Sequence, residues 1–204
     1  MAPAGATAAH GTPGKKPTVV LVHGAFADSS SWNGVVERPK KDGYPVVAPA
    51  NPLRGYQSDA DYVKSFLKSV KGPVVLAGHS YRGAVISKAA EGEPNVKALV
   101  YIAAFAPDKG ESALELSNKY PGSTLGPTLN TVPFPLPDGG TGNDLYIKAD
   151  KFHRQFAADV PTWVMAQRAH SRTTEIKASH AVTVSRPGAV TRVIEQAASA
   201  TTGH

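Results

Sequence analysis

The sequence predicts an α/β protein with a mainly parallel sheet flanked by helices. Short runs of β-branched and other apolar residues recur along the chain and end in glycine, proline or a turn, which is typical of strands buried on both faces. Segments with apolar residues at helical spacing separate these runs. Strands that alternate with helices in this way form parallel sheets covered on both faces. The length of 204 residues favours one domain.

The first half of the chain supplies most of the expected elements. Strands are expected over four ranges: 17–23, 44–48, 73–77 and 96–105. Between them, helices are expected from Trp32, after the capping serines 29–31, and over 62–70 and 84–90. Pro39 lies inside the first of these helices. Because an interior proline costs a helix about 3 kcal/mol, we expect a kink or an early end there.

The second half begins with an insertion. From Asp108 to Pro161 proline and glycine cluster, and 145–158 then become amphipathic. Such an insertion after a strand is typical of a lid over the strand ends, where substrate selectivity is determined. Further on, the pattern predicts a helix over 163–169, a short strand over 173–176 and a last helix from Arg186. The whole forms a single domain over 17–204.

Composition excludes several classes of protein. With no cysteine, the chain has no disulfide, thiol nucleophile or cysteine metal site. The net charge of +6 is scattered, with no basic run beyond Lys40-Lys41, so a solvated surface is favoured over a nucleic-acid interface. No run approaches the ~20 apolar residues of a membrane span, so we expect a soluble protein.

Residues 1–16 differ from the rest of the chain. They are rich in Ala, Gly, Pro and Thr and contain no apolar run, which predicts a flexible leader that is not a signal peptide. A small-residue segment of this kind also follows removed signals. The compartment therefore stays open between the cytoplasm and secretion after removal of a signal that this chain does not contain.

The stretch LAGHSYRGAV contains the clearest chemical motif. Ser80 lies between an expected strand and an expected helix, with Gly78 two residues before it, as in the G-x-S-x-G turn that presents a nucleophilic serine. The second glycine is replaced by Arg82. A long side chain at this position should point to solvent or push the helix away from the sheet, and Gly83 should absorb part of that strain. The simpler alternative makes Ser80 a helix cap.

Two further regions complete a serine hydrolase site. After the first strand, the turn His23-Gly24-Ala25 offers the Ala25 N–H, beside that of Tyr81, to a developing oxyanion; His23 itself is interpreted as structural. His180 follows late in the chain, where the base of such a triad belongs. Three other histidines are expected outside the chemistry: His79, which should point away from Ser80, and the surface residues His153 and His170.

Together these segments resemble the α/β hydrolase superfamily, and most closely its bacterial esterases related to plant methyl-ester esterases and hydroxynitrile lyases. The likeness covers nearly all of residues 17–200. It rests on the runs PTVVLVHGAFADSSSW, GYPVVAPANPLRG, GPVVLAGHSYRGAV, VKALVYIAAFAPDKGES and ASHAVTVSRP. The resemblance implies a reduced α/β hydrolase fold, with Ser80 as nucleophile, His180 as base and the N–H groups of Ala25 and Tyr81 as oxyanion hole.

The sequence departs from this family at the triad acid. Such enzymes carry a further strand and an acidic turn between lid and histidine, and here Val160-Pro161-Thr162 runs almost directly toward His180. Asp108, just past the strand 96–105, is the preferred replacement, and it is equally interpreted as a turn cap. Asp159 and Glu111 are weaker candidates, and a Ser-His dyad without an acid is the remaining alternative.

The predicted function is hydrolysis of small to medium hydrophobic carboxylic esters through an acyl-serine intermediate, with no metal or organic cofactor. One alternative is a catalytically impaired hydrolase-like protein that binds a ligand or partner. Another is hydroxynitrile lyase-like activity, which Ala181 disfavours because related lyases carry a lysine after the histidine. Loss of a strand would also expose a sheet edge, which favours a homodimer.

Overall fold

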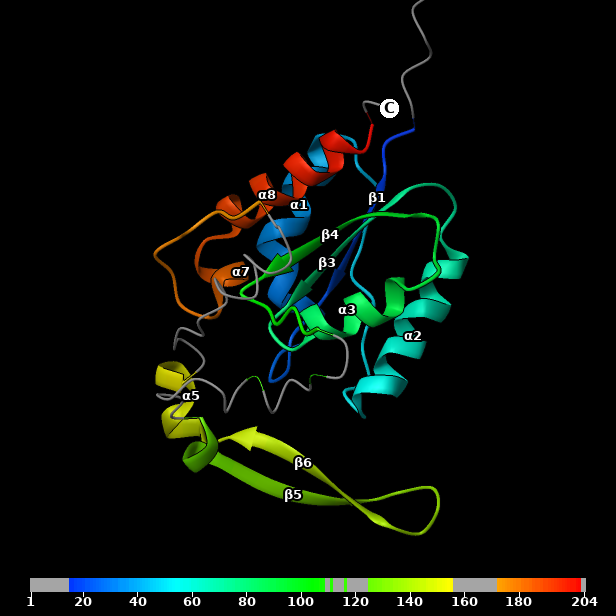
Figure 1. Ribbon diagram of the computed structural model, residues 1–204. Helices are drawn as coiled ribbons and strands as arrows, with labels where there is room; N and C mark the ends of the chain where they lie inside the picture. The colour runs from blue at the N-terminus through cyan, green and yellow to red at the C-terminus, as the bar shows by residue number, and fades with distance from the viewer. Residues whose placement is uncertain (1–14, 109–110, 112–115, 117–124, 156–171, 203–204) are drawn as a thin grey trace, which may run out of the picture.

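A computed structural model describes residues 15–108, 111, 116, 125–155 and 172–202. Its centre is a parallel sheet with strand order β2-β1-β3-β4 (Figure 1). The strands are β1 (Thr18–Val22), β2 (Val46–Val47), β3 (Val74–His79) and β4 (Val96–Ile102). The parallel sheet predicted from the buried apolar runs is therefore confirmed.

Helices cover both faces of this sheet, because successive residues of the central strands point to opposite sides. Val19 and Leu21 of β1 pack into a core with α1 (Asn33–Lys41) and α8 (Pro187–Ala200). Val20 and Val22 pack into a second core with α2 (Tyr56–Ser69) and α3 (Arg82–Ala90). The largest buried side chains of these two cores include Trp32, Leu67, Ile86 and Ile194.

The start of the first helix differs from the sequence prediction in its cap and its length. A short 3-10 helix, η1 (Ser29–Trp32), precedes α1, and its cap is Asp28, whose carboxylate accepts the Ser30 N–H at 2.8 Å. The serines themselves are therefore not the cap. The helix continues past Pro39 to Lys41, with Pro39 buried. The proline lies in the last turns, so it removes only a bond near the end of the helix.

The insertion after β4 contains a β-hairpin that the sequence did not indicate. After η2 (Gly126–Thr128), strands β5 (Leu129–Pro135) and β6 (Thr141–Ile147) pair antiparallel, and α5 (Ala149–Gln155) follows. Pro133 and Pro135 obscure this pattern, yet a two-stranded ribbon tolerates proline where the N–H would face solvent. In Figure 1 the hairpin and α5 lie beyond the carboxyl ends of β3 and β4, where a lid belongs.

The C-terminal part confirms one prediction and corrects another. Helix α8 begins with a proline at its first position, which suits a helix start. The strand expected over 173–176 is wrong: residues 172–179 have irregular backbone, because an extended segment becomes a strand only when it pairs with a neighbour. A short helix, α7 (Val182–Ser185), was not expected. The predicted leader, apart from its last residues, and the predicted helix over 163–169 lie outside the described residues.

Candidate active site

Ser80 lies in a strained turn at the carboxyl end of β3. Its φ of 59° is in the left-handed region, which side chains other than glycine seldom adopt. The turn is fixed by backbone hydrogen bonds: the Ser80 N–H donates to the carbonyl of Ile102 at 3.1 Å, and the Phe105 N–H donates to the Ser80 carbonyl at 3.1 Å. This is the geometry that a strand-turn-helix serine nucleophile requires.

The structure brings His180 to Ser80 across about half of the chain. Nε2 of His180 lies 2.8 Å from Oγ of Ser80, so the hydroxyl donates to this nitrogen when the neutral ring carries its proton on Nδ1. His180 lies just before α7, and burial lowers its pKa from the ordinary value. The imidazole is therefore uncharged near neutral pH and able to accept a proton.

His79 is closer to the chemistry than the sequence suggested. Its ring is buried, its Nε2 lies 2.7 Å from the backbone carbonyl of His180, and the two rings are 4.8 Å apart. Because a carbonyl only accepts, Nε2 of His79 carries the proton and donates it. Burial, followed by the neighbouring His180, lowers the pKa of His79 to about 4. A neutral His79 thus holds the backbone of His180 through this hydrogen bond.

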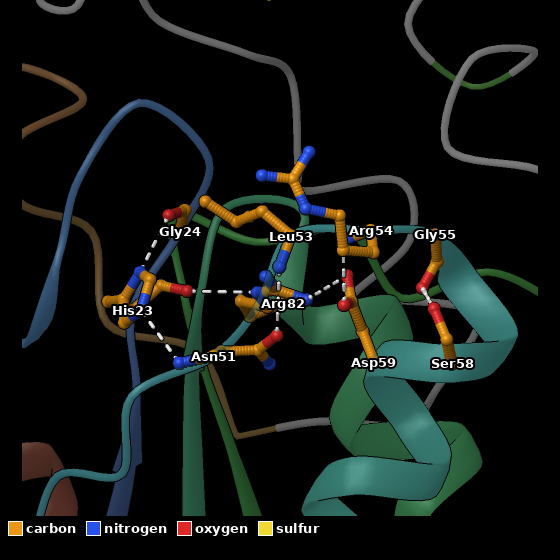
Figure 2. Close-up of polar contacts among 9 residues, drawn as sticks. All are labelled: His23, Gly24, Asn51, Leu53, Arg54, Gly55, Ser58, Asp59 and Arg82. Carbon is orange, nitrogen blue, oxygen red and sulfur yellow. Dashed lines mark hydrogen bonds and ion pairs between the residues drawn. The ribbon is translucent and has the colours of Figure 1, made fainter. Parts of the chain in front are cut away.

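Arg82 is buried, and both outcomes expected for it are wrong. Its side chain is 0% exposed, with Nη1 2.7 Å from Oδ2 of Asp59 and Nε donating to the His23 carbonyl at 3.0 Å (Figure 2). The residue of α3 that must be small is the next one, Gly83. A Cβ at Gly83 would lie 2.1 Å from the Phe105 carbonyl oxygen. Position 82 therefore does not need to be small.

The two candidate oxyanion donors border a common cavity. Ala25 and Tyr81 both line a cavity of about 710 Å³, which is bounded on another side by the hairpin and α5. Tyr81 immediately precedes α3, so its N–H lies at a helix start, where backbone donors have no partner within the helix. Their joint role as an oxyanion hole stays a prediction.

Arg54, on the wall of this cavity, contacts both strands of the hairpin. Nη1 of Arg54 lies 2.7 Å from Oδ1 of Asp144 on β6, and its guanidinium stacks 4.4 Å from the centre of the Phe134 ring on β5. The cavity residues from the body of the protein and the lid are Ala25, Phe26, Ala27, Asp28, Pro52, Leu53, Arg54, Gly55, Asp59, Tyr81, Asn143, Asp144, Leu145, Tyr146, Ile147 and Phe152.

The triad acid stays a prediction. Asp108 is exposed after β4, where its N–H donates to the Glu111 carboxylate at 2.8 Å and its carbonyl accepts the Glu111 N–H at 3.1 Å. These backbone bonds are those of a turn. Asp159 and His170 lie outside the described residues, as does the side chain of His153.

The described residues show neither a helix that could span a membrane nor a metal site. No helix within them is long and apolar enough to cross a membrane. In the same part of the chain, no group of three or more acidic or histidine side chains is arranged to hold a metal ion.

The chain matches one protein family and is similar to several known proteins. The model of a family described as "Alpha/beta hydrolase family" matches residues 19–194. A carbendazim hydrolyzing esterase from Nocardioides sp. (strain SG-4G) is 30% identical over 113 residues, which are 49% of this chain and 47% of the relative. An α/β hydrolase, nvfD, from Aspergillus novofumigatus (strain IBT 16806) is 33% identical over 116 residues, which are 48% of this chain and 46% of the relative.

The chain thus spans about half the length of the curated relatives it matches. Among solved structures, polyneuridine aldehyde esterase superimposes with a TM-score of 0.72 at 16% identity, over 89% of this chain and 99% of the other. At this level of identity the likeness concerns the fold.

Proposed function

Because this chain belongs to the α/β hydrolase family, we propose that it is a serine hydrolase that cleaves carboxylic esters of small to medium hydrophobic groups. One observation carries the proposal: Oγ of Ser80, in a left-handed turn with φ 59°, lies 2.8 Å from Nε2 of the partly buried, neutral His180. A serine hydroxyl becomes nucleophilic when such a base removes its proton.

The reaction would proceed in two halves. Oγ of Ser80 attacks the ester carbonyl while Nε2 of His180 takes the hydroxyl proton, and the tetrahedral oxyanion is stabilised by the N–H groups of Ala25 and Tyr81. Collapse of this intermediate expels the alcohol, which receives the proton from His180. Water, deprotonated by the same nitrogen, then attacks the acyl-serine; the acid is released as the bond to Oγ breaks, and His180 returns the proton to Oγ of Ser80. This chemistry needs neither a metal nor an organic cofactor.

An acid would fix the tautomer of His180 and stabilise its charged form. We keep Asp108 as the proposed acid because it follows β4, the neighbour of the nucleophile strand β3. A Ser-His dyad is the alternative, and the Asp108 variant described below distinguishes the two.

The substrate class is proposed from the lining of the cavity. Aromatic and aliphatic side chains, among them Phe26, Leu53 and Phe152, line the space beside Ala25 and Tyr81. Such surfaces favour apolar acyl or alcohol groups. The Nocardioides relative is named as an esterase, which supports ester hydrolysis as the reaction. The buried, paired Arg82 removes one reason for considering the site disabled.

The test is hydrolysis of p-nitrophenyl acetate and butyrate by the parent protein and by the variants Ser80→Ala, His180→Ala and Asp108→Asn. We expect the first two variants to lose at least about 10³-fold in kcat, and Asp108→Asn to lose about 10⁴-fold if it is the acid. Unchanged activity of Asp108→Asn would favour the dyad.

Ser69→Ala is the matched control, since Ser69 is an exposed serine at the end of α2. It should retain parental activity. A parent protein no faster than Ser80→Ala would overturn the proposed function.

A further inference from the structure

A buried arginine, Arg82, lies two residues after the proposed nucleophile. Arg82 begins α3 directly beside the Ser80 turn, and its fork-shaped guanidinium donates to two different segments of chain. In Figure 2 it lies between the end of β1 on one side and the start of α2 on the other. A planar guanidinium is suited to holding two acceptors at a fixed separation, which a lysine ammonium is not.

The first acceptor belongs to the loop that carries one oxyanion donor. Nε of Arg82 donates to the carbonyl of His23, two residues before Ala25. The same histidine accepts the Asn51 N–H on its Nε2 at 3.2 Å. The loop is tightly packed against the Ser80 turn: a Cβ at Gly24 would lie 2.8 Å from Nδ1 of His79 and 3.0 Å from Cβ of Ser80. A movement of the His23 carbonyl would therefore be transmitted to the turn around Ser80.

The second acceptor, Asp59, holds the loop at the wall of the cavity beside Ala25 and Tyr81. Asp59, 0% exposed in the first turn of α2, binds Nη1 of Arg82 with Oδ2 and accepts the Arg54 N–H with Oδ1 at 3.0 Å. The loop it holds contains Leu53 in the left-handed region, with φ 57°. Leu53, Arg54 and Asp59 all line the cavity.

This arrangement is not explained by stability alone. A buried ion pair recovers little more than the cost of removing both charges from water, and apolar residues of similar volume are often at least as stable. The pair is also incompletely satisfied, since Nη2 of Arg82 is buried and has no acceptor within the part of the chain that the structure describes. The hydrogen bonds that Arg82 does make, to the His23 carbonyl and to Asp59, connect two segments next to Ser80.

We propose that Arg82 is a positioning residue, which with Asp59 fixes the oxyanion loop at His23 and the cavity wall at Leu53-Arg54 relative to Ser80. The proposal rests on the esterase function above and adds a requirement to it. The arginine at this position is then part of the hydrolase site, although it does not contact the reacting atoms.

The expected size of the effect follows from how strictly catalysis depends on geometry. A displacement of about 1 Å of a catalytic group costs about 10²-fold in rate. Loss of one oxyanion donor costs about 10²–10³-fold in kcat. Much of the apolar lining, including Leu145, Tyr146 and Phe152, comes from β6 and α5, which Arg82 does not hold, so KM should change much less than kcat.

The experiment compares Arg82→Lys, the double variant Arg82→Met with Asp59→Leu, and the control Leu67→Ala. The lysine keeps a charge opposite Asp59 without the fork. The double variant removes both charges together, so that neither is left buried and unpaired. Leu67 is a fully buried core residue farther along α2 and away from the cavity, so its truncation tests a loss of stability alone.

For each protein we would measure kcat and KM for p-nitrophenyl butyrate and the rate at which a fluorophosphonate labels Ser80, after urea denaturation has shown that the protein is folded in the assay. The expected result is a decrease of about 100-fold in kcat and in labelling rate for both Arg82 variants, with KM within a few-fold of the parent. Leu67→Ala should keep the kcat of the parent.

Parental kcat in either folded Arg82 variant, or an equal loss of kcat in Leu67→Ala, would overturn the positioning role while leaving the esterase function intact. A parent without Ser80-dependent hydrolysis would overturn both. If Arg82→Lys does not fold, the double variant alone decides between these results.

Discussion

At the scale of single residues, the two histidines beside Ser80 have separate tasks. His180 faces the serine hydroxyl through Nε2, while His79, the last residue of β3, donates to the His180 backbone carbonyl. Burial lowers the pKa of both rings, and that of His79 falls to about 4. In the proposed mechanism the His180 ring exchanges protons with Ser80, whereas the His79 ring stays neutral.

The lowered pKa of His180 predicts the acid limb of the pH profile. Hydrolysis requires the neutral ring, so kcat/KM falls as pH decreases through the pKa of His180 in the free enzyme. Since burial lowers this pKa, the midpoint should lie below the ordinary value of about 6.5. Measurement with p-nitrophenyl acetate between pH 4 and 8 checks the prediction. A midpoint above 6.5 would contradict it.

The buried His79 predicts a loss of stability in acid. Its folded pKa of about 4 lies below the unfolded value of 6.5, so between these pH values the unfolded chain binds more protons. The free energy of unfolding therefore falls as pH decreases from about 6.5 to 4, by about 3 kcal/mol from this group, and the contribution does not grow further below pH 4.

Comparison with His79→Gln isolates the contribution of His79 to the acid sensitivity of the free energy of unfolding, because glutamine offers an N–H donor to His180 and does not titrate. Urea unfolding at pH 7 and pH 4 should show a smaller difference in the variant than in the parent. Exposed carboxylates titrate alike in both proteins and cancel. Equal differences in the two proteins would assign the acid sensitivity to other groups.

The residues of the site were predictable from sequence to different degrees. Ser80 and His180 follow from a local motif and its order, because chemistry restricts which residue types can occupy those places. The partnership of Arg82 with Asp59 was not predictable, since 22 positions separate the two residues and Asp59 has the pattern of an ordinary helix start. Local patterns do not indicate which buried charges meet in space.

At the scale of elements, the hairpin formed by β5 and β6 attaches to the body through Arg54. This residue binds Asp144 and stacks on Phe134, and its own backbone N–H is held by Asp59. The side chains of Arg54 and Asp144 are 48% and 26% exposed, so their ion pair contributes at most about 1 kcal/mol. The contact between Arg54 and the hairpin therefore contributes little to stability.

Asp144→Asn should therefore alter substrate handling more than stability. We expect a change below about 1 kcal/mol in the free energy of unfolding and a few-fold higher KM for the butyrate ester, because Asp144 lines the cavity. Asp150→Asn is the control, since Asp150 forms an exposed pair with Lys151 and does not line the cavity. An unchanged KM in Asp144→Asn, measured under the same conditions, would show that this contact does not shape the site.

Among elements, the central ones were predictable and the peripheral ones were not. β1 and β3 are apolar on both faces, so composition alone identifies them. The hairpin carries two prolines and mostly exposed side chains, and the expected strand at 173–176 depended on a pairing that the segment does not make. In both cases strand formation depends on whether the segment pairs with another, which its own residue pattern does not indicate.

At the scale of the whole molecule, the sheet has β2 and β4 at its edges in the described part of the chain. A second cavity, of about 930 Å³, lies between β4 and α8, with Leu99, Tyr101, Arg192 and Gln196 among the residues that line it. An edge strand presents backbone groups to another chain, and Lys97 on β4 is exposed, as in strands that resist such pairing.

The homodimer suggested by the sequence remains a prediction at this scale. Pairing through the β4 edge should give a sedimentation coefficient that rises with protein concentration toward that of a dimer. A monomer mass at every concentration would contradict this prediction and would be consistent with protection of the β4 edge by Lys97.

The buried pair of Arg82 and Asp59 also limits how this sequence can change over evolutionary time. Replacing either residue alone by an uncharged one leaves the other as an uncompensated charge in the interior, a change that typically costs about 3–5 kcal/mol, a large part of the ~5–15 kcal/mol that keeps a domain folded. The two positions can change safely only together or after other substitutions have added stability. Proteins that carry this pair should therefore lose or keep both residues together, even where the site itself is not under selection.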